Sequence, residues 1–173
     1  MKKVKIIVLI VVGIVAVIFL LALVMPKDFQ MERAIVIDAP QTMVETQVAN
    51  FENFQKWSPW SELDPEMDTK IEGTDGQVGT VYSWSGNDDV GVGSMEITRR
   101  EANRVDMALN FKEPWESTAD TYFTWQPKDG GTEVVWGMSG KNPVPFNLFM
   151  NMDKMVGPDY EKGLAKLKDR VEK

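Results

Sequence analysis

The 173-residue sequence contains no histidine and no cysteine. Without them there is no Ser-His or Cys-His catalytic arrangement, and the usual ligand sets for zinc, copper, haem and iron–sulfur clusters are absent. No disulfide can form, so packing of the core must stabilise the fold. The formal net charge is −7, and a chain this acidic offers no basic surface to neutralise phosphates. We therefore expect no metal, no cofactor and no nucleic-acid partner.

A long apolar run lies near the N-terminus, where no charged or strongly polar side chain occurs between Ile6 and Met25. At ~1.5 Å per residue, a helix over this run spans about 30 Å, the thickness of a bilayer's hydrocarbon core. The alternative is a cleaved signal peptide, whose apolar region covers only about 7–15 residues and ends in a small-x-small cleavage site. The sequence from Ala22 to Pro26 fits such a site poorly. We therefore predict an uncleaved transmembrane signal anchor at residues 6–25, in contact with the lipid bilayer.

Basic residues precede this anchor, because Lys2, Lys3 and Lys5 fall within residues 1–5, a predicted cytoplasmic tail. The positive-inside rule then places the N-terminus in the cytoplasm and residues 26–173 beyond the cell membrane, in a periplasmic or extracellular position. All 26 acidic residues follow the anchor. From this negative charge we expect a domain that is repelled by anionic headgroups and stands clear of the membrane surface.

Residues 26–173 contain short runs rich in β-branched and aromatic residues, separated by turn signals such as Ser85-Gly86-Asn87. Such spacing predicts an antiparallel meander. Along these runs apolar residues alternate with polar ones, so one face of the sheet is expected to be apolar and to need a cover. The expected strands cover residues 29–37, 69–72, 79–84, 91–99, 104–111, 117–125 and 132–138.

Two short helical segments are expected between the first two strands. Asp38 is the expected cap of a short amphipathic helix that begins near Pro40. A second short helix or turn is expected within residues 51–60, and Pro59 should end it.

A long amphipathic helix is expected at the C-terminal end. Apolar residues recur there at spacings of three and four from Phe149 to Val171, which is the spacing of one helix face. This face is the expected cover of the sheet. Because proline removes a hydrogen bond and clashes inside a helix, we expect a break at Gly157 with a fresh start at Pro158.

The order of strand, two short helices, antiparallel strands and long C-terminal helix resembles the helix-grip fold of the START-like (SRPBCC) superfamily. Within this superfamily, four short sequence segments resemble those of the bacterial branch of polyketide cyclase/dehydrase-like proteins. These segments are FQKWSPW at 54–60, GTVYSWSG at 79–86, GTEVVW at 131–136 and GLAKLK at 163–168.

The resemblance covers about residues 29–173 and implies an α+β fold. In this fold a curved antiparallel sheet grips the last helix, and a mostly apolar cavity lies between them. Members of the superfamily bind lipids, sterols, aromatic polyketides or hormones, and some catalyse cyclisation or dehydration. The branch has no well-defined shared catalytic motif to carry over.

The chain has six tryptophans, and such side chains either fill a core or line a pocket for a flat or apolar ligand. Methionine has the same two roles, because it adapts to irregular gaps and to varied ligands. The candidate cavity-lining residues are Trp57, Trp60, Tyr82, Trp84, Met107, Phe111, Phe123, Trp125, Trp136, Met138, Phe149 and Met152.

The sequence favours a membrane-anchored START-like domain, at residues 26–173, that binds a hydrophobic small molecule or lipid between sheet and helix. We assign no catalytic residue, because no two carboxylates form a recognisable acid/base set. One alternative is a protein-interaction module in envelope maintenance, which a filled interior and an exposed apolar patch would favour. The other is a cyclase/dehydrase-type enzyme on an apolar substrate, which a buried carboxylate or tyrosine at the cavity would favour. No particular protein partner follows from the sequence.

Overall fold

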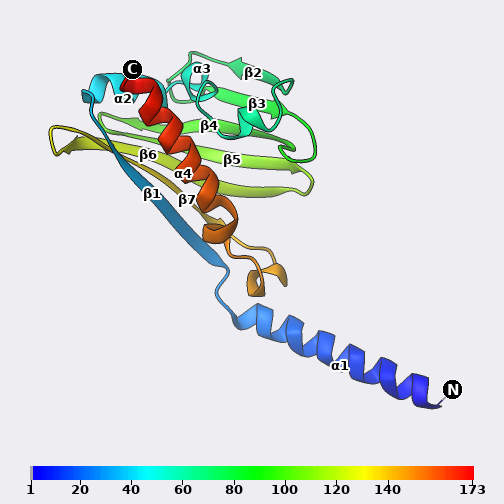
Figure 1. Cartoon of the computed structure of the whole chain (residues 1–173). Helices are drawn as coiled ribbons and strands as arrows, with labels where there is room; N and C mark the ends of the chain where they lie inside the picture. The colour runs from blue at the N-terminus through cyan, green and yellow to red at the C-terminus, as the bar shows by residue number, and fades with distance from the viewer. Residues whose placement is uncertain (1) are drawn as a thin grey trace.

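The computed structural model describes residues 2–173, which form a projecting helix and a sheet-based domain (Figure 1). Helix α1 (Lys2–Val24) leads away from the domain, and nearly all of its side chains are exposed. The segment Lys3–Val24 is long and apolar enough to cross a membrane, a property that anchors and signal sequences share. Exposed apolar surface of this extent is rare on soluble monomers.

The domain is built on one antiparallel sheet of seven strands in the order β1-β7-β6-β5-β4-β3-β2. The first strand pairs with the last, and the strands between them follow one another as neighbours. The predicted meander is confirmed, with strands that run a few residues further than expected at several ends. The strands are β1 (Asp28–Ile37), β2 (Asp68–Glu72), β3 (Val81–Ser85), β4 (Val92–Glu101), β5 (Arg104–Glu113), β6 (Ser117–Lys128) and β7 (Gly131–Lys141).

The alternation of side chains decides which face of the sheet is covered. On β5, Val105, Met107 and Leu109 are buried, whereas Asp106 and Ala108 between them are partly exposed. The neighbouring strands β6 and β7 show the same pattern. Because successive side chains of a strand point to opposite faces, all the buried ones lie on one side of the sheet.

Short helices connect β1 to β2 and close one end of the domain. They are α2 (Gln41–Val48), α3 (Phe51–Phe54) and the 3-10 helix η1 (Trp60–Glu62). Two expectations were wrong here. Pro40, not Asp38, precedes α2, and it makes no side-chain cap, while the backbone N–H of Asp38 donates instead to Glu172. Pro59 does not end a helix, because α3 already ends at Phe54, and Pro59 is instead the N-cap residue of η1.

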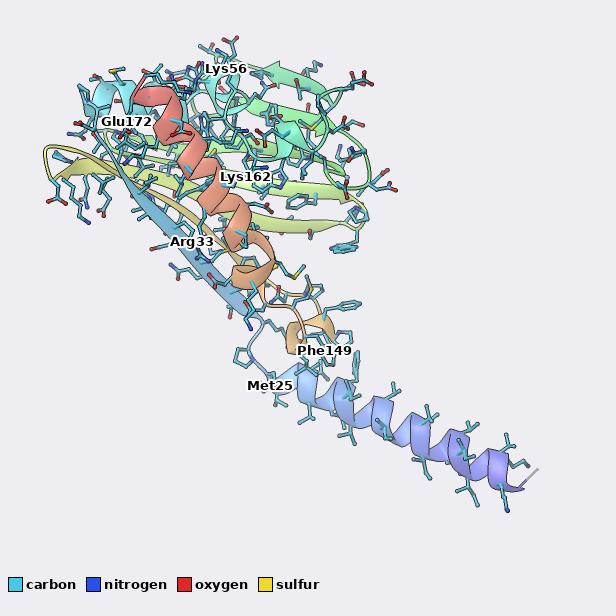
Figure 2. The ribbon with its side chains drawn as sticks, viewed as in Figure 1. Met25, Arg33, Lys56, Phe149, Lys162 and Glu172 are labelled. Atoms are coloured by element: carbon cyan, nitrogen blue, oxygen red, sulfur yellow. The ribbon has the colours of Figure 1, made fainter. Side chains whose placement is uncertain are left out.

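Helix α4 (Met152–Val171) covers the apolar face without interruption, so the predicted break at Pro158 was wrong. The Asn151 side chain caps its N-terminus by accepting from the backbone N–H of Lys154. Arg33 of β1 pairs with Asp153 at 2.7 Å and with Glu161 at 2.6 Å. Because these two carboxylates lie on either side of Pro158, Arg33 ties both parts of the helix to one strand (Figure 2).

Helix α4 runs antiparallel to β1. Its beginning lies over the start of the strand, whereas Lys168 and Glu172 contact Val36 and Asp38 near the strand's other end. The 3-10 helix η2 (Phe146–Leu148) connects β7 to α4. A curved antiparallel sheet that grips one long helix is the α+β helix-grip arrangement that the sequence predicted (Figure 1).

Candidate ligand-binding cavity

A cavity of about 390 Å³ lies between the sheet and the beginning of α4. Strands β3 to β7 supply one wall, and Met152, Val156 and Tyr160 of α4 supply the other. Trp60 of η1 closes the side toward the short helices. The volume is within the range of pockets that hold small organic ligands.

The cavity occupies only one half of the space beneath α4, because large side chains fill the other half. Trp57, Phe123 and Trp125 are each about 1% exposed, and they share the core with Leu164 and Leu167 of α4. Toward the start of α4 the helix presents flexible methionines and a valine instead. The sheet and helix therefore meet tightly at the end near Val171 and leave space at the end near Met152.

Aromatic rings form the closed end of the cavity. The Trp136 indole stacks on the Tyr160 phenol, with ring centroids 3.8 Å apart and planes inclined by 18°. Trp60 meets Trp136 edge-on at 5.8 Å. Farther along the sheet, Trp84 packs edge-on against Phe111 at 5.9 Å. Rings at these separations are held in place by each other and offer flat apolar surface to a ligand.

One cluster of hydrogen bonds lies within this aromatic end. The Thr121 hydroxyl donates to the carbonyl of Gly137 at 2.9 Å and accepts from Trp136 Nε1 at 3.1 Å. A hydroxyl has a single proton, so Tyr160 must be the donor in its 3.3 Å contact with Thr121. The Tyr160 oxygen thus keeps acceptor capacity, and its ring lines the cavity.

Both tyrosines in the cavity wall are neutral at physiological pH. Burial raises the pKa of Tyr82 to about 12 and also raises the pKa of Tyr160. The ionisable carboxylates and amine among the lining residues are exposed or half-buried: Asp88, Asp89, Glu113, Lys141 and Asp159. The lining residues thus include no buried carboxylate, and their buried ionisable groups are the hydroxyls of Tyr82 and Tyr160, which meet the tyrosine condition of the enzyme alternative.

The structure brings seven of the twelve predicted residues to the cavity wall. They come from η1, from the three strands β3, β5 and β7, and from α4. These residues are Trp60, Tyr82, Trp84, Phe111, Trp136, Met138 and Met152.

The structure places the other five predicted residues elsewhere. Trp57, Met107, Phe123 and Trp125 point to the same side of the sheet but are packed in the filled half of the core. Phe149 is 72% exposed, because the chain forms η2 and a loop there instead of extending the C-terminal helix.

Several residues of the cavity wall were not among those predicted from the sequence. Thr121 stood out as a polar residue in the inward-facing row of β6, and Tyr160 lay on the apolar stripe of the last helix. These two patterns could have identified the polar cluster. Trp115, which is not among the twelve predicted residues, also lines the cavity.

Comparison with known proteins supports the geometry. Residues 28–172 match the family described as polyketide cyclase / dehydrase and lipid transport. No curated protein matches the chain.

Solved structures share the fold at low sequence identity. A protein from Nitrosospira multiformis is 19% identical, with a TM-score of 0.61, over 83% of this chain and 96% of its own. A protein from Chromobacterium violaceum is 16% identical, with a TM-score of 0.60, over 86% and 99%. Major latex-like protein 151 from Panax ginseng is 16% identical, with a TM-score of 0.55, over 84% and 96%. At such identities the likeness establishes the fold alone.

Proposed function

The chain belongs to the polyketide cyclase / dehydrase and lipid transport family, and we propose that it is a membrane-anchored binding protein for a lipid or other hydrophobic small molecule. The observation that carries this proposal is the cavity of about 390 Å³ beneath α4, with walls of aromatic and methionine side chains. Helix α1 anchors the domain in the cell membrane, with the N-terminus in the cytoplasm and the binding domain on the periplasmic or extracellular side.

The wall chemistry indicates what kind of ligand fits. Apolar rings and thioethers favour a body without charge, because a charged group would lose its hydration there without a buried counter-ion. The Tyr82 hydroxyl and the oxygen of Tyr160, both in the cavity wall, offer one donor and one acceptor. We therefore propose a ligand with a mainly hydrocarbon body and at most a small neutral polar group, such as a hydroxyl.

Native mass spectrometry of residues 26–173, purified without detergent, tests this proposal. Similar solved structures cover 82–86% of this chain, so this part is expected to fold without α1. The expected result is a co-purifying mass of a few hundred daltons that is lost on denaturation. An apo mass that stays unchanged when fatty acids, sterols and polyketides are offered would contradict binding in the cavity.

Two alanines provide a matched pair of variants for this measurement. Ala119 of β6 lines the cavity, whereas Ala108 of the adjacent β5 lies on the opposite face of the sheet. Ala119→Phe should fill part of the cavity and abolish the bound mass, and Ala108→Phe should retain it. Retention of the bound mass in Ala119→Phe would show that the bound molecule sits elsewhere.

A further inference from the structure

The cavity opens at the end of the sheet from which α1 leaves. Its exposed wall residues belong to the β3–β4 loop, the β5–β6 turn with the start of β6, the end of β7 and the first turns of α4. These segments all lie at the end where β1 begins, because Asp28 of β1 pairs with Lys141 of β7. We call this opening the mouth, and its exposed wall residues are Asp88, Asp89, Glu113, Pro114, Trp115, Thr118, Lys141, Pro143 and Met155.

The mouth lies close to the end of α1. Only residues 25–27 separate α1 from β1, and three residues span at most about 11 Å. The Asn147 side chain of η2 donates to the carbonyl of Ala22 at 3.0 Å, and its amide also lies 3.4 Å from the carbonyls of Met25 and Pro26. The loop before α4 is therefore fastened to the last turn of α1.

This contact fixes the position of the loop before α4 relative to the bilayer that α1 would span. Ala22 lies two residues inside the end of α1, which corresponds to about 3 Å along a helix. If α1 spans a bilayer up to Val24, the segment around Asn147 is level with the edge of the hydrocarbon. Phe146 and Phe149, on either side of Asn147, are both more than half exposed. Figure 2 shows Phe149 beside this end of α1.

Exposed apolar side chains gather at this end of the molecule. Beyond Met25, the described residues include seven exposed large hydrophobic side chains. Four of them lie at the mouth or on the loop beside it: Trp115, Phe146, Phe149 and Met155. A local concentration of this kind marks an interaction surface, and tryptophan in particular favours the membrane–water interface.

From these observations we infer that the mouth rests on the bilayer that holds α1, so that the cavity exchanges its ligand directly with the adjacent lipid leaflet. The four residues Trp115, Phe146, Phe149 and Met155, which we call the apolar rim, dip into the interface around the mouth. This inference rests on the proposed anchoring and binding, and it adds the route: the ligand is a membrane-dissolved molecule that reaches the cavity without crossing water.

Charge does not drive this contact. The mouth carries the carboxylates of Asp88, Asp89 and Glu113 against the single amine of Lys141. The contact therefore relies on apolar side chains and needs no anionic lipid. This contact departs from the expectation that the acidic domain stands clear of the membrane surface. Because it relies on apolar side chains, zwitterionic phosphatidylcholine is the appropriate probe.

The absence of cysteine allows a direct test by site-directed spin labelling of the full chain in phosphatidylcholine nanodiscs. Single-cysteine variants Phe149→Cys and Trp115→Cys place a nitroxide on each side of the mouth. Val78→Cys is the matched control, because Val78 and Trp115 are both 59% exposed but Val78 lies outside the mouth. Val12→Cys reports on α1 itself.

The measured quantity is the accessibility of each label to oxygen divided by its accessibility to a water-soluble nickel chelate. Labels in Val12→Cys, Phe149→Cys and Trp115→Cys should each give a ratio several-fold above that in Val78→Cys. A lipid-like ratio in Val12→Cys with water-like ratios at the mouth would overturn this inference while leaving the anchor intact. A lipid-like ratio in Phe149→Cys but not Trp115→Cys would also overturn it, because the mouth would then tilt away from the bilayer.

Two further results distinguish a failure of this inference from a failure of the proposed anchoring or ligand binding. A water-like ratio in Val12→Cys would refute the anchor and the membrane-facing mouth together. Ligand retention by residues 26–173, measured by native mass spectrometry, is independent of the nanodisc result. Loss of that retention would instead remove the proposed ligand binding.

Discussion

The Trp136 indole of β7 stacks on the Tyr160 phenol of α4, with 3.8 Å between ring centroids. The two rings join the last strand to the last helix at the boundary between the filled core and the cavity. On its other side, Trp136 meets Trp57 at 5.5 Å and Phe123 at 4.9 Å, and both of these residues belong to the core. A change at this pair should therefore affect both the stability of the domain and the shape of the cavity.

Removing the Tyr160 hydroxyl tests the polar cluster without removing the stack. Tyr160→Phe keeps the ring but leaves Thr121 with one partner fewer, which should lower the free energy of unfolding by about 1 kcal/mol. Urea unfolding of residues 26–173 measures this change. Tyr122→Phe is the control, because Tyr122 donates to Glu32 on the outer face of the same sheet. A larger loss in Tyr122→Phe than in Tyr160→Phe would contradict the importance of the buried cluster.

Gly163 allows α4 to approach Trp136. A Cβ at this position would lie 2.8 Å from Trp136 Cζ3 and 3.1 Å from Pro59 Cδ. Helix propensity alone predicts that Gly163→Ala stabilises the helix by about 1 kcal/mol, whereas overpacking costs about 1–3 kcal/mol. We expect overpacking to prevail, with net destabilisation in urea unfolding. Ala165→Gly, at an exposed position of α4, is the control that measures the effect of helix propensity alone. A stabilised Gly163→Ala would show that the helix does not lie this close to Trp136.

The sheet and its buried face could be predicted because they depend on local patterns. Alternation along β5 to β7 reports which side of each strand is apolar, and that side is buried in the structure. The apolar run of α1 is just as local, since it needs no partner within the chain. The stripe from Val156 to Val171 identified the helix that covers the sheet.

What the sequence could not supply were contacts between distant elements. Arg33 contacts α4 on both sides of Pro158, and it lies 120 residues before Asp153 and 128 before Glu161. Alternation likewise places Trp125 and Trp136 among inward-facing residues, but it does not say how far along the sheet α4 departs from it. Core and cavity residues therefore look alike in the sequence, and only the tertiary packing separates them.

Acid should weaken the link between η1 and α4. Lys162 and Lys166 contact Glu62 at 2.7 and 2.9 Å, and their hydrogen bonds lower the pKa of Glu62 to about 2. A carboxylate whose pKa is depressed by folding adds stability above its ordinary pKa and loses it as pH falls toward the folded value. Glu62→Gln should therefore have a lower thermal midpoint than the parent at pH 7, and the gap should shrink below pH ~4.5.

The control for this acid dependence is Glu66→Gln. Glu66 is exposed, and its carboxylate accepts no hydrogen bond within the part of the chain that the structure describes. Its midpoint should follow that of the parent from pH 7 down to pH ~3.5. A gap between Glu62→Gln and the parent that stays constant or widens with acid would contradict the role of the two lysines.

Asn147 should control how firmly the domain is held to α1. In Asn147→Ala the carbonyls of Ala22, Met25 and Pro26 lose their side-chain donor. Loss of one net hydrogen bond of about 1 kcal/mol corresponds to roughly fivefold faster opening of the loop. Hydrogen exchange of the full chain in nanodiscs should therefore show faster exchange at residues 146–150 and unchanged exchange in β5 and β6. Asn110→Ala, on the outer face of β5, should leave the loop unchanged. Unaltered exchange in Asn147→Ala would mean that the domain turns freely on residues 25–27, and the mouth would then have no fixed direction relative to the bilayer.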